Sequence, residues 1–202
     1  MRQSIYMLLA ILVYQWDIKI KQVSIINQNQ KSTSKINFKN KNMKLLTKIT
    51  KPILLPHWSQ DLFLTIPRIV CGYLLAFDFG ASKFGMPWSP VDNNLGLFEV
   101  AFWFPNDVAS YGGIFAVAPA FFAWMGALTE AVGGLFLLFG LQTRITSFLI
   151  ICTMLVAIFM QQIQNGLWNC LAAMGFLWVA MFYLIVGSGR VGIDYLLTKN
   201  KA

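Results

Sequence analysis

Four long apolar runs constrain the fold of this chain more than any other feature. They lie at about residues 62–83, 115–139, 145–163 and 167–186. A bilayer with a hydrocarbon core about 30 Å thick requires about 20 helical residues per crossing. Because lipid cannot satisfy backbone polar groups, spanning segments of this length are helical. We therefore predict an all-α fold, an integral membrane four-helix bundle, rather than a soluble protein with buried helices.

The composition agrees with a membrane protein. Of the 202 residues, 57% are hydrophobic and 12% are charged, whereas a soluble domain carries roughly 25% charged residues. The net charge of +8 comes from residues 1–51, which hold ten Lys or Arg and one acid, while residues 52–202 hold six basic and seven acidic residues. Because the positive charge is confined to one arm, we expect the lipid bilayer and not a nucleic acid as partner.

The N-terminal part of the chain differs from the rest. Residues 1–42 contain an apolar stretch too short to span a bilayer, followed by a Lys-, Asn- and Ile-rich stretch without helical periodicity. We predict that this basic extension is disordered. We interpret Met43 as the true start, with residues 43–60 as a cytoplasmic or interfacial lead-in and 61–198 as the four-helix transmembrane domain.

The basic residues of the short loops predict the orientation. Positive residues favour the cytoplasmic side, and those on one side are Lys44, Lys48, Lys51, Arg144, Arg190, Lys199 and Lys201. The connection 84–114 contains no Lys or Arg. We therefore expect both termini in the cytoplasm and the spans in a bacterial inner membrane. The apolar stretch "LGLFEVAFWF" in that connection is either a helix in the outer interface or a lid over a site between the helices.

Charged residues inside the spans are the candidate functional residues. Inserting a charged side chain into lipid costs free energy, so such residues are usually functional. A rise of about 1.5 Å per residue places Arg68 about 10 Å and Glu130 about 15 Å from the cytoplasmic side. We therefore expect an Arg68–Glu130 ion pair within the bundle. Asp78 and Lys83 lie near the outer end, where they would pair or reach the interface.

Small residues lie on the helix faces that carry Arg68 and Glu130. Close packing of membrane helices uses glycines, and the candidates here are Gly72, Gly126, Gly133 and Gly134. Two interpretations of Arg68 and Glu130 stay open. Either the pair only locks two helices together, or it lines a cavity for a polar or redox-active ligand or relays protons.

The cysteines and the histidine of the sequence do not form a metal-binding pattern. Cys71, Cys152 and Cys170 form no C-x-x-C pair and lie in apolar runs, as small buried hydrophobic residues do. His57 is the single histidine. We predict no metal ligands in this chain.

Four blocks of sequence resemble the DoxX-like family of small four-helix membrane proteins. They are "PRIVCGYLL", "GASKFG", "TEAVGGLFLLFGLQTR" and "GSGRVGIDYLL", and the resemblance covers about residues 61–196. The blocks gather a set of residues at the expected cytoplasmic face: Gly140, Thr143, Arg144, Gly187, Gly189, Arg190 and Asp194. Four residues apart, Arg190 and Asp194 are expected to pair with each other or with Arg144.

The resemblance implies a role in membrane redox or stress response. The family takes its name from relatives associated with a thiosulfate:quinone oxidoreductase, and other members look like partners of redox-stress or assembly complexes. We therefore expect an accessory component that binds a partner complex or a second copy of itself. The alternative is a quinone-linked oxidoreductase subunit with quinone near Arg68 and Glu130, although no catalytic residue is identified. A small transporter is disfavoured, since no inverted repeat is visible.

Overall fold

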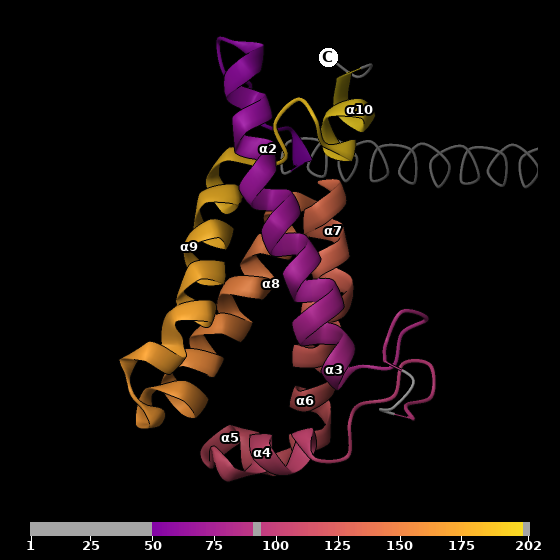
Figure 1. Cartoon of the computed structure of the whole chain (residues 1–202), viewed down its shortest axis with the longest axis vertical. Coiled ribbons are helices and arrows are strands. Elements are labelled where there is room, and N and C mark those ends of the chain that lie inside the picture. The colour runs from indigo at the N-terminus through magenta and orange to yellow at the C-terminus, as the bar shows by residue number, and fades with distance from the viewer. Residues whose placement is uncertain (1–49, 91–93, 200–202) are drawn as a thin grey trace, which may run out of the picture. The chain divides into compact units, whose positions relative to one another are not determined.

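The computed structural model describes residues 50–90 and 94–199. The predicted disorder of residues 1–42 and the start at Met43 lie outside the described residues. The all-α prediction is confirmed, because four helices are long and apolar enough to cross a membrane (Figure 1). In the described part, strand-like pairing is limited to one isolated β-bridge, between Phe84 and Val100. The four spans are Trp58–Lys83, Pro119–Phe139, Thr143–Asn165 and Leu167–Val186.

The spans are composite helices. Three of them contain a π-helical stretch, in which an extra residue shifts the helix face that later side chains occupy. The first span consists of α2 (Trp58–Tyr73), η1 (π, Leu74–Gly80) and α3 (Ala81–Lys83). The second consists of α6 (Pro119–Leu128), η3 (π, Thr129–Gly133) and α7 (Gly134–Phe139). The third and fourth consist of α8 (Thr143–Val156), η4 (π, Ala157–Gln162) and η5 (Ile163–Asn165), then η6 (Leu167–Cys170) and α9 (Leu171–Val186).

Three short helices lie outside the spans. They are α4 (Phe104–Ser110), α5 (Gly113–Val117) and α10 (Ile193–Lys199). The second span begins at Pro119 and not at the predicted residue 115. A residue before proline is disfavoured in the helical region, and Ala118 has φ −141° and ψ 62°, which separates α5 from α6. Figure 1 shows α4 and α5 at one end of the spans and α10 at the other.

The first two spans pack with their backbones almost in contact. A Cβ on Gly72 would lie 2.6 Å from the Leu138 nitrogen, and a Cβ on Gly134 would lie 2.6 Å from the Ala76 nitrogen. A Cβ on Gly80 would lie 2.5 Å from the Ala131 backbone. These contacts fix the antiparallel register of the two spans and therefore the depth of every side chain on them.

Two buried clusters complete the packing. One joins α8 and α9 and includes Ile150, Met154 and Phe176. The other holds α4 against α6 and includes Phe104 and Val108. The second cluster places the connection between the first two spans directly over the helix that carries Glu130.

Candidate functional site

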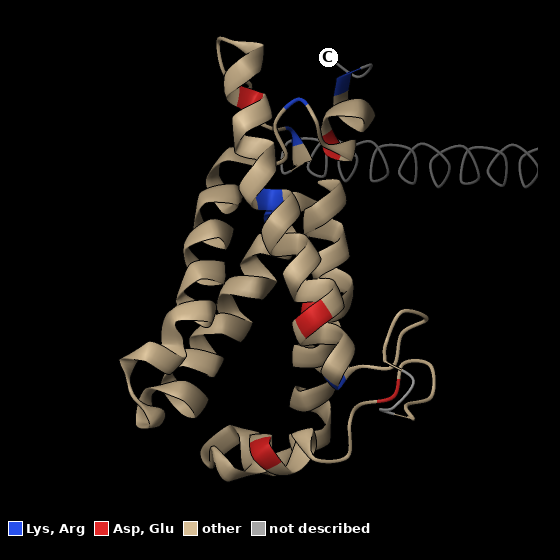
Figure 2. Ribbon diagram, viewed as in Figure 1, with Lys and Arg blue, Asp and Glu red and all other residues tan. Residues whose placement is uncertain are grey.

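Charged side chains gather at one end of the bundle and are sparse elsewhere along the spans (Figure 2). We call this end, where α2 begins and α9 ends, the arginine end, after Arg68, Arg144 and Arg190. The opposite end, where α4 and α5 lie, is called the cavity end. All seven residues that the sequence assigns to one face lie at the arginine end. Asp61 also lies there, as does Tyr183, whose hydroxyl donates to the Leu64 carbonyl oxygen, and the sequence did not single out either residue.

Arg68 holds the loop after α9. Its side chain is 1% exposed, and its Nη1 and Nη2 donate to the carbonyl oxygens of Ser188 (2.5 Å) and Val191 (3.4 Å). The loop turns through Gly187 and Gly189, whose φ values of 78° and 66° suit glycine. Arg68 therefore binds backbone at the end of the bundle.

Asp194 caps the third span. Its Oδ1 accepts from the Gln142 amide at 2.7 Å, and its Oδ2 accepts from the Thr143 amide at 2.9 Å. A carboxylate at this position satisfies N–H groups that the first turn of a helix leaves free. The carboxylate thus joins α10 to the start of α8.

The predicted Arg190–Asp194 pairing is therefore not formed. Arg190 pairs instead with the buried Asp61 at 3.2 Å and donates to the Leu55 carbonyl oxygen at 2.8 Å. Arg144 donates to the Ile185 carbonyl oxygen at 3.0 Å. An acid in the first turn of a membrane helix was the signal that could have identified Asp61.

The predicted Arg68–Glu130 ion pair is not formed either. A side chain on Gly140 would meet the Arg68 guanidinium, so Arg68 is level with the end of α7. Glu130 is ten residues back along the second span, about 15 Å deeper. The predicted depth of Arg68 counts from residue 62 as the start of the first span at the membrane boundary. The helix starts at Trp58, and Arg68 lies at the bundle end.

Glu130 pairs with Lys83 instead. Lys83 Nζ lies 2.6 Å from Glu130 Oε2, with the two side chains 16% and 5% exposed. The same ammonium lies 5.3 Å from the centre of the Phe104 ring, an arrangement that adds cation–π attraction. Asp78 is exposed on η1, and no cation of the described residues pairs with it. The buried carboxylate therefore finds its partner on the first span, but at a different residue.

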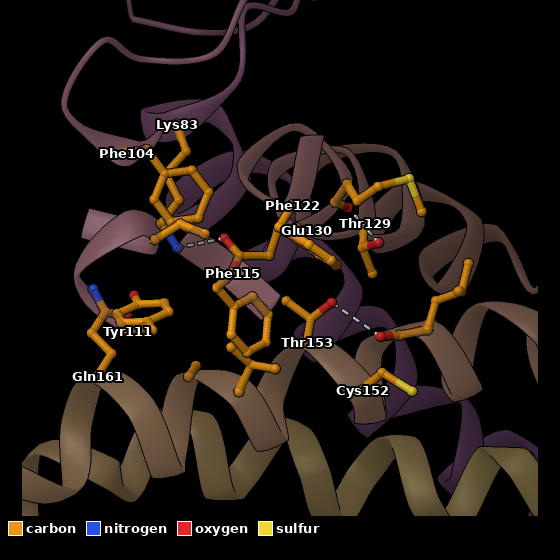
Figure 3. Close-up of a pocket in the computed structure, with 16 residues that line it drawn as sticks. Lys83, Phe104, Tyr111, Phe115, Phe122, Thr129, Glu130, Cys152, Thr153 and Gln161 are labelled. Carbon is orange, nitrogen blue, oxygen red and sulfur yellow. Dashed lines mark hydrogen bonds and ion pairs between the residues drawn. The ribbon is translucent and has the colours of Figure 1, made fainter. Parts of the chain in front are cut away.

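A cavity of about 310 Å³ lies beside this ion pair (Figure 3). That volume is at the lower end of the range of small-molecule sites. Most of the lining is apolar, and the polar groups besides the pair are Tyr111, Thr129, Thr153 and Gln161. The apolar and aromatic lining residues are Phe104, Val108, Phe115, Phe122, Met125, Gly126, Leu149, Cys152, Val156 and Ala157.

The π-helical stretches supply much of the site. η3 carries Thr129 and Glu130, η4 carries Ala157 and Gln161, and η1 leads into Lys83. π-helical turns occur frequently at functional sites. Gly126 lines the cavity and does not make a close helix contact, and a Cβ on Gly133 would lie 3.5 Å from the Thr146 methyl group. The helical spacing in the sequence does not reveal these positions.

The connection between the first two spans forms one wall of the cavity. Phe104 and Val108 from α4 face it, together with Tyr111 and Phe115. Burial, followed by the charges of Asp107 and Glu130, raises the pKa of the Tyr111 phenol, so the phenol keeps its proton and can donate a hydrogen bond. Of the apolar stretch 95–104, Phe104 lines the cavity, and the choice between an interfacial helix and a lid stays a prediction.

The cysteines and the histidine do not form a metal site in the part of the chain described. No three His, Cys, Asp or Glu side chains come together there. Cys152 is exposed and lines the cavity, whereas Cys71 is partly buried and Cys170 is fully buried. Leu149, beside Cys152 on the lining, is 39% exposed. The cavity therefore borders α8 near the middle of the third span.

Comparison with known families gives a match to DoxX over residues 63–162. Comparison with curated proteins and with solved structures gave no match. The matched region contains the close contact of the first two spans, the Lys83–Glu130 pair and most of the third span. The block "GSGRVGIDYLL" lies beyond it. Over residues 63–162, this multi-pass membrane protein belongs to the DoxX family.

Proposed function

We propose that this protein holds a lipid-soluble quinone in the cavity and serves as an accessory component of a membrane redox complex. The observation that carries the proposal is the partly buried Lys83–Glu130 pair, 2.6 Å apart, at the edge of a mostly apolar cavity of about 310 Å³. Sites for small ligands combine apolar walls with a few placed polar groups in this way. Intramembrane charges of this kind are retained for function by default.

The lining residues fit the chemistry of a quinone head group. The rings of Phe104, Phe115 and Phe122 offer aromatic faces and edges. The Lys83 ammonium and the Tyr111 phenol can donate to ring oxygens, and Glu130 can hold or release a proton. A bound quinone would supply electron-carrying capacity, and these groups would bind it, orient it and exchange protons.

The ligand would reach the cavity from the lipid. Leu149 and Cys152 of α8 lie on the lining and are exposed. Cys152 is nine residues from the start of α8, about 14 Å along the helix axis. Access at this depth favours a ligand that dissolves in the bilayer over one that arrives from water.

The redox association rests on the family. We assign electron supply to a partner complex, in line with the association of DoxX-like relatives with a thiosulfate:quinone oxidoreductase. The orientation is proposed on loop charge: Arg144 and Arg190 share one end, which we place in the cytoplasm of a bacterial inner membrane.

A quinone-binding measurement tests the proposal. The purified full-length chain in lipid nanodiscs is titrated with a short-chain benzoquinone, and quenching of tryptophan fluorescence is followed. A Cβ on Gly126 would approach Phe104 no closer than 3.7 Å, so Gly126→Leu fills the cavity with little backbone strain. We expect this variant to raise the Kd by about tenfold or more, ~1.4 kcal/mol.

Gly175→Leu is the matched control, because it adds the same volume on α9, where a Cβ meets nothing within 4 Å. It should leave the Kd unchanged. If wild type shows no saturable quenching, or if a folded Gly126→Leu variant binds as wild type does, the cavity does not hold quinone.

The alternative, a catalytic oxidoreductase subunit, is favoured by the position of Glu130 in the cavity, where it could exchange protons with a ligand. The two functions separate in membranes that contain the partner complex. With Glu130→Gln, an accessory holder should show a raised KM for quinone and an unchanged maximal rate. A catalytic subunit should lose maximal rate at saturating quinone.

A further inference from the structure

We propose that Asp78 is the docking point for a transmembrane helix of a different protein, one that carries a lysine or arginine near the middle of its span. This inference deepens the proposed accessory role, because it names the chemistry of the partner. It rests on the depth of Asp78, its exposure and its lack of a counter-ion among the described residues.

The packing of the first two spans places Asp78 deep in the bundle. Ala76 contacts Gly134, and Gly80 contacts Ala131. Asp78, halfway between them, is therefore level with residues 132–133 of the second span. The midpoint of that span, Pro119–Phe139, is only three or four residues away, about 5 Å along the axis. Measured against the second span, Asp78 thus lies nearer the middle of the bundle than the outer end at which the sequence places it.

Asp78 faces outward at this depth. It is exposed, and so is the next residue, Phe79 (38%). The neighbouring side of η1 is covered by this chain, because the Trp88 indole donates to the Ala76 carbonyl oxygen at 3.1 Å and packs on Phe77. An ionisable group within a span is normally turned inward or paired. Asp78 is neither, so its partner lies outside the described residues.

The nearest cation on the same span is already used. Lys83 turns inward to Glu130 at 2.6 Å. It would leave a buried carboxylate without a counter-charge if it turned to Asp78 instead. A positive charge or hydrogen-bond donors for the Asp78 carboxylate must therefore come from outside the described residues, and we assign them to another molecule.

The described residues of a second copy of this chain do not meet that requirement. In the described residues, Arg68 and Arg190 are held by carbonyl oxygens and by Asp61, and Lys83 is held by Glu130. The other described cations, Lys51, Arg144 and Lys199, lie at the arginine end. Since two copies in one membrane share an orientation, none of these cations reaches the depth of Asp78. A different membrane protein fits the charge.

Site-specific photocrosslinking in native membranes tests this inference. A p-benzoylphenylalanine probe replaces Ser82, which is exposed and one turn from Asp78. The control probe replaces Trp178, which is 72% exposed on α9. We expect the Ser82 probe to crosslink one membrane protein whose span contains a mid-depth Lys or Arg. Asp78→Asn, in the same background, should lower the yield about tenfold, whereas Asp78→Glu should retain it.

The decisive variant is a charge exchange. Asp78→Lys should abolish the crosslink, and changing the identified cation of the partner to Asp should restore it. A crosslink to a second copy, a partner without an intramembrane cation, no crosslink at all, or an unchanged yield with Asp78→Asn would each overturn the inference.

The inference and the proposed function fail separately. Asp78 does not line the cavity, so Asp78→Asn should bind quinone with the Kd of wild type in nanodiscs. If Asp78→Asn loses the crosslink but binds quinone as wild type does, the function proposed for the cavity still holds. If the crosslink forms as expected but wild type binds no quinone, only the docking of a partner at Asp78 is supported.

Discussion

At the scale of single residues, the depth of a charged side chain decides which partner it finds. Glu130 and Arg68 lie on neighbouring helices but are separated by about 15 Å along the axis. Lys83 reaches Glu130 because Gly80 packs directly against Ala131. The ion pair is therefore a consequence of the register of the first two spans.

Breaking this pair should destabilise the bundle. Lys83→Met leaves the Glu130 carboxylate buried without a counter-charge. We expect a loss towards the lower end of the ~3–5 kcal/mol typical of a broken buried pair, because Lys83 keeps 16% exposure. Thermal unfolding in detergent, followed by circular dichroism, measures the loss.

The double variant Lys83→Met with Glu130→Gln is the control for this prediction. Because it removes both charges, it should recover much of the stability. Equal stabilities of wild type and Lys83→Met would mean that Glu130 does not depend on Lys83.

The second prediction at this scale concerns the cap of α8. Asp194 accepts from two backbone amides, those of Gln142 and Thr143. Asp194→Ala should cost about 1–2 kcal/mol, the upper range for loss of a helix cap. Leu196→Ala, at an exposed position of the same helix α10 (66%), should change the unfolding temperature little. A fall of equal size in both variants would place the effect in α10 and not in the cap.

At the scale of elements, small residues fix how the first two spans meet. Gly134→Ala would bring a Cβ within 2.6 Å of the Ala76 nitrogen. Backbone atoms cannot rotate away, so the spans must separate. We expect a loss of about 1–3 kcal/mol, the usual cost of overpacking, measured as unfolding in detergent.

Gly175→Ala is the matched control for this prediction. A Cβ on Gly175 meets nothing within 4 Å, and alanine has a better helix propensity by about 1 kcal/mol. This variant should unfold at the same temperature as wild type or slightly above. If Gly134→Ala were equally stable, the close approach of the two spans would not exist in the protein.

The elements also show where sequence reasoning succeeds and where it stops. The length of the apolar runs predicted the four spans. The fourth span, Leu167–Val186, has the predicted bounds. Helical periodicity assumes a regular helix, so it could not place the side chains that follow η1, η3 and η4. Depth counted from the first apolar residue also fails when a helix begins earlier than that residue, as α2 does at Trp58. Because of these two effects, the sequence did not predict that Glu130 pairs with Lys83 or that Arg68 lies at the arginine end.

At the scale of the whole molecule, the distribution of charge predicts a direction across the membrane. In the described residues, Arg144 and Arg190 lie at the arginine end, while α4 and α5 at the cavity end carry Asp107 and no Lys or Arg. Positive residues in short loops stay in the cytoplasm. The cavity end should therefore face the outside, and its lid should be accessible from there.

Cysteine accessibility tests this orientation. With Cys71, Cys152 and Cys170 replaced by alanine, single cysteines are placed at Asn106 in α4 and at Gln142 before α8, both exposed positions. A membrane-impermeant maleimide on intact spheroplasts should label Asn106→Cys, because the cavity end faces the reagent. It should label Gln142→Cys only after lysis, when the cytoplasmic side becomes accessible. The reverse pattern would invert the molecule in the membrane. It would place the cavity lid in the cytoplasm, against the distribution of its charges.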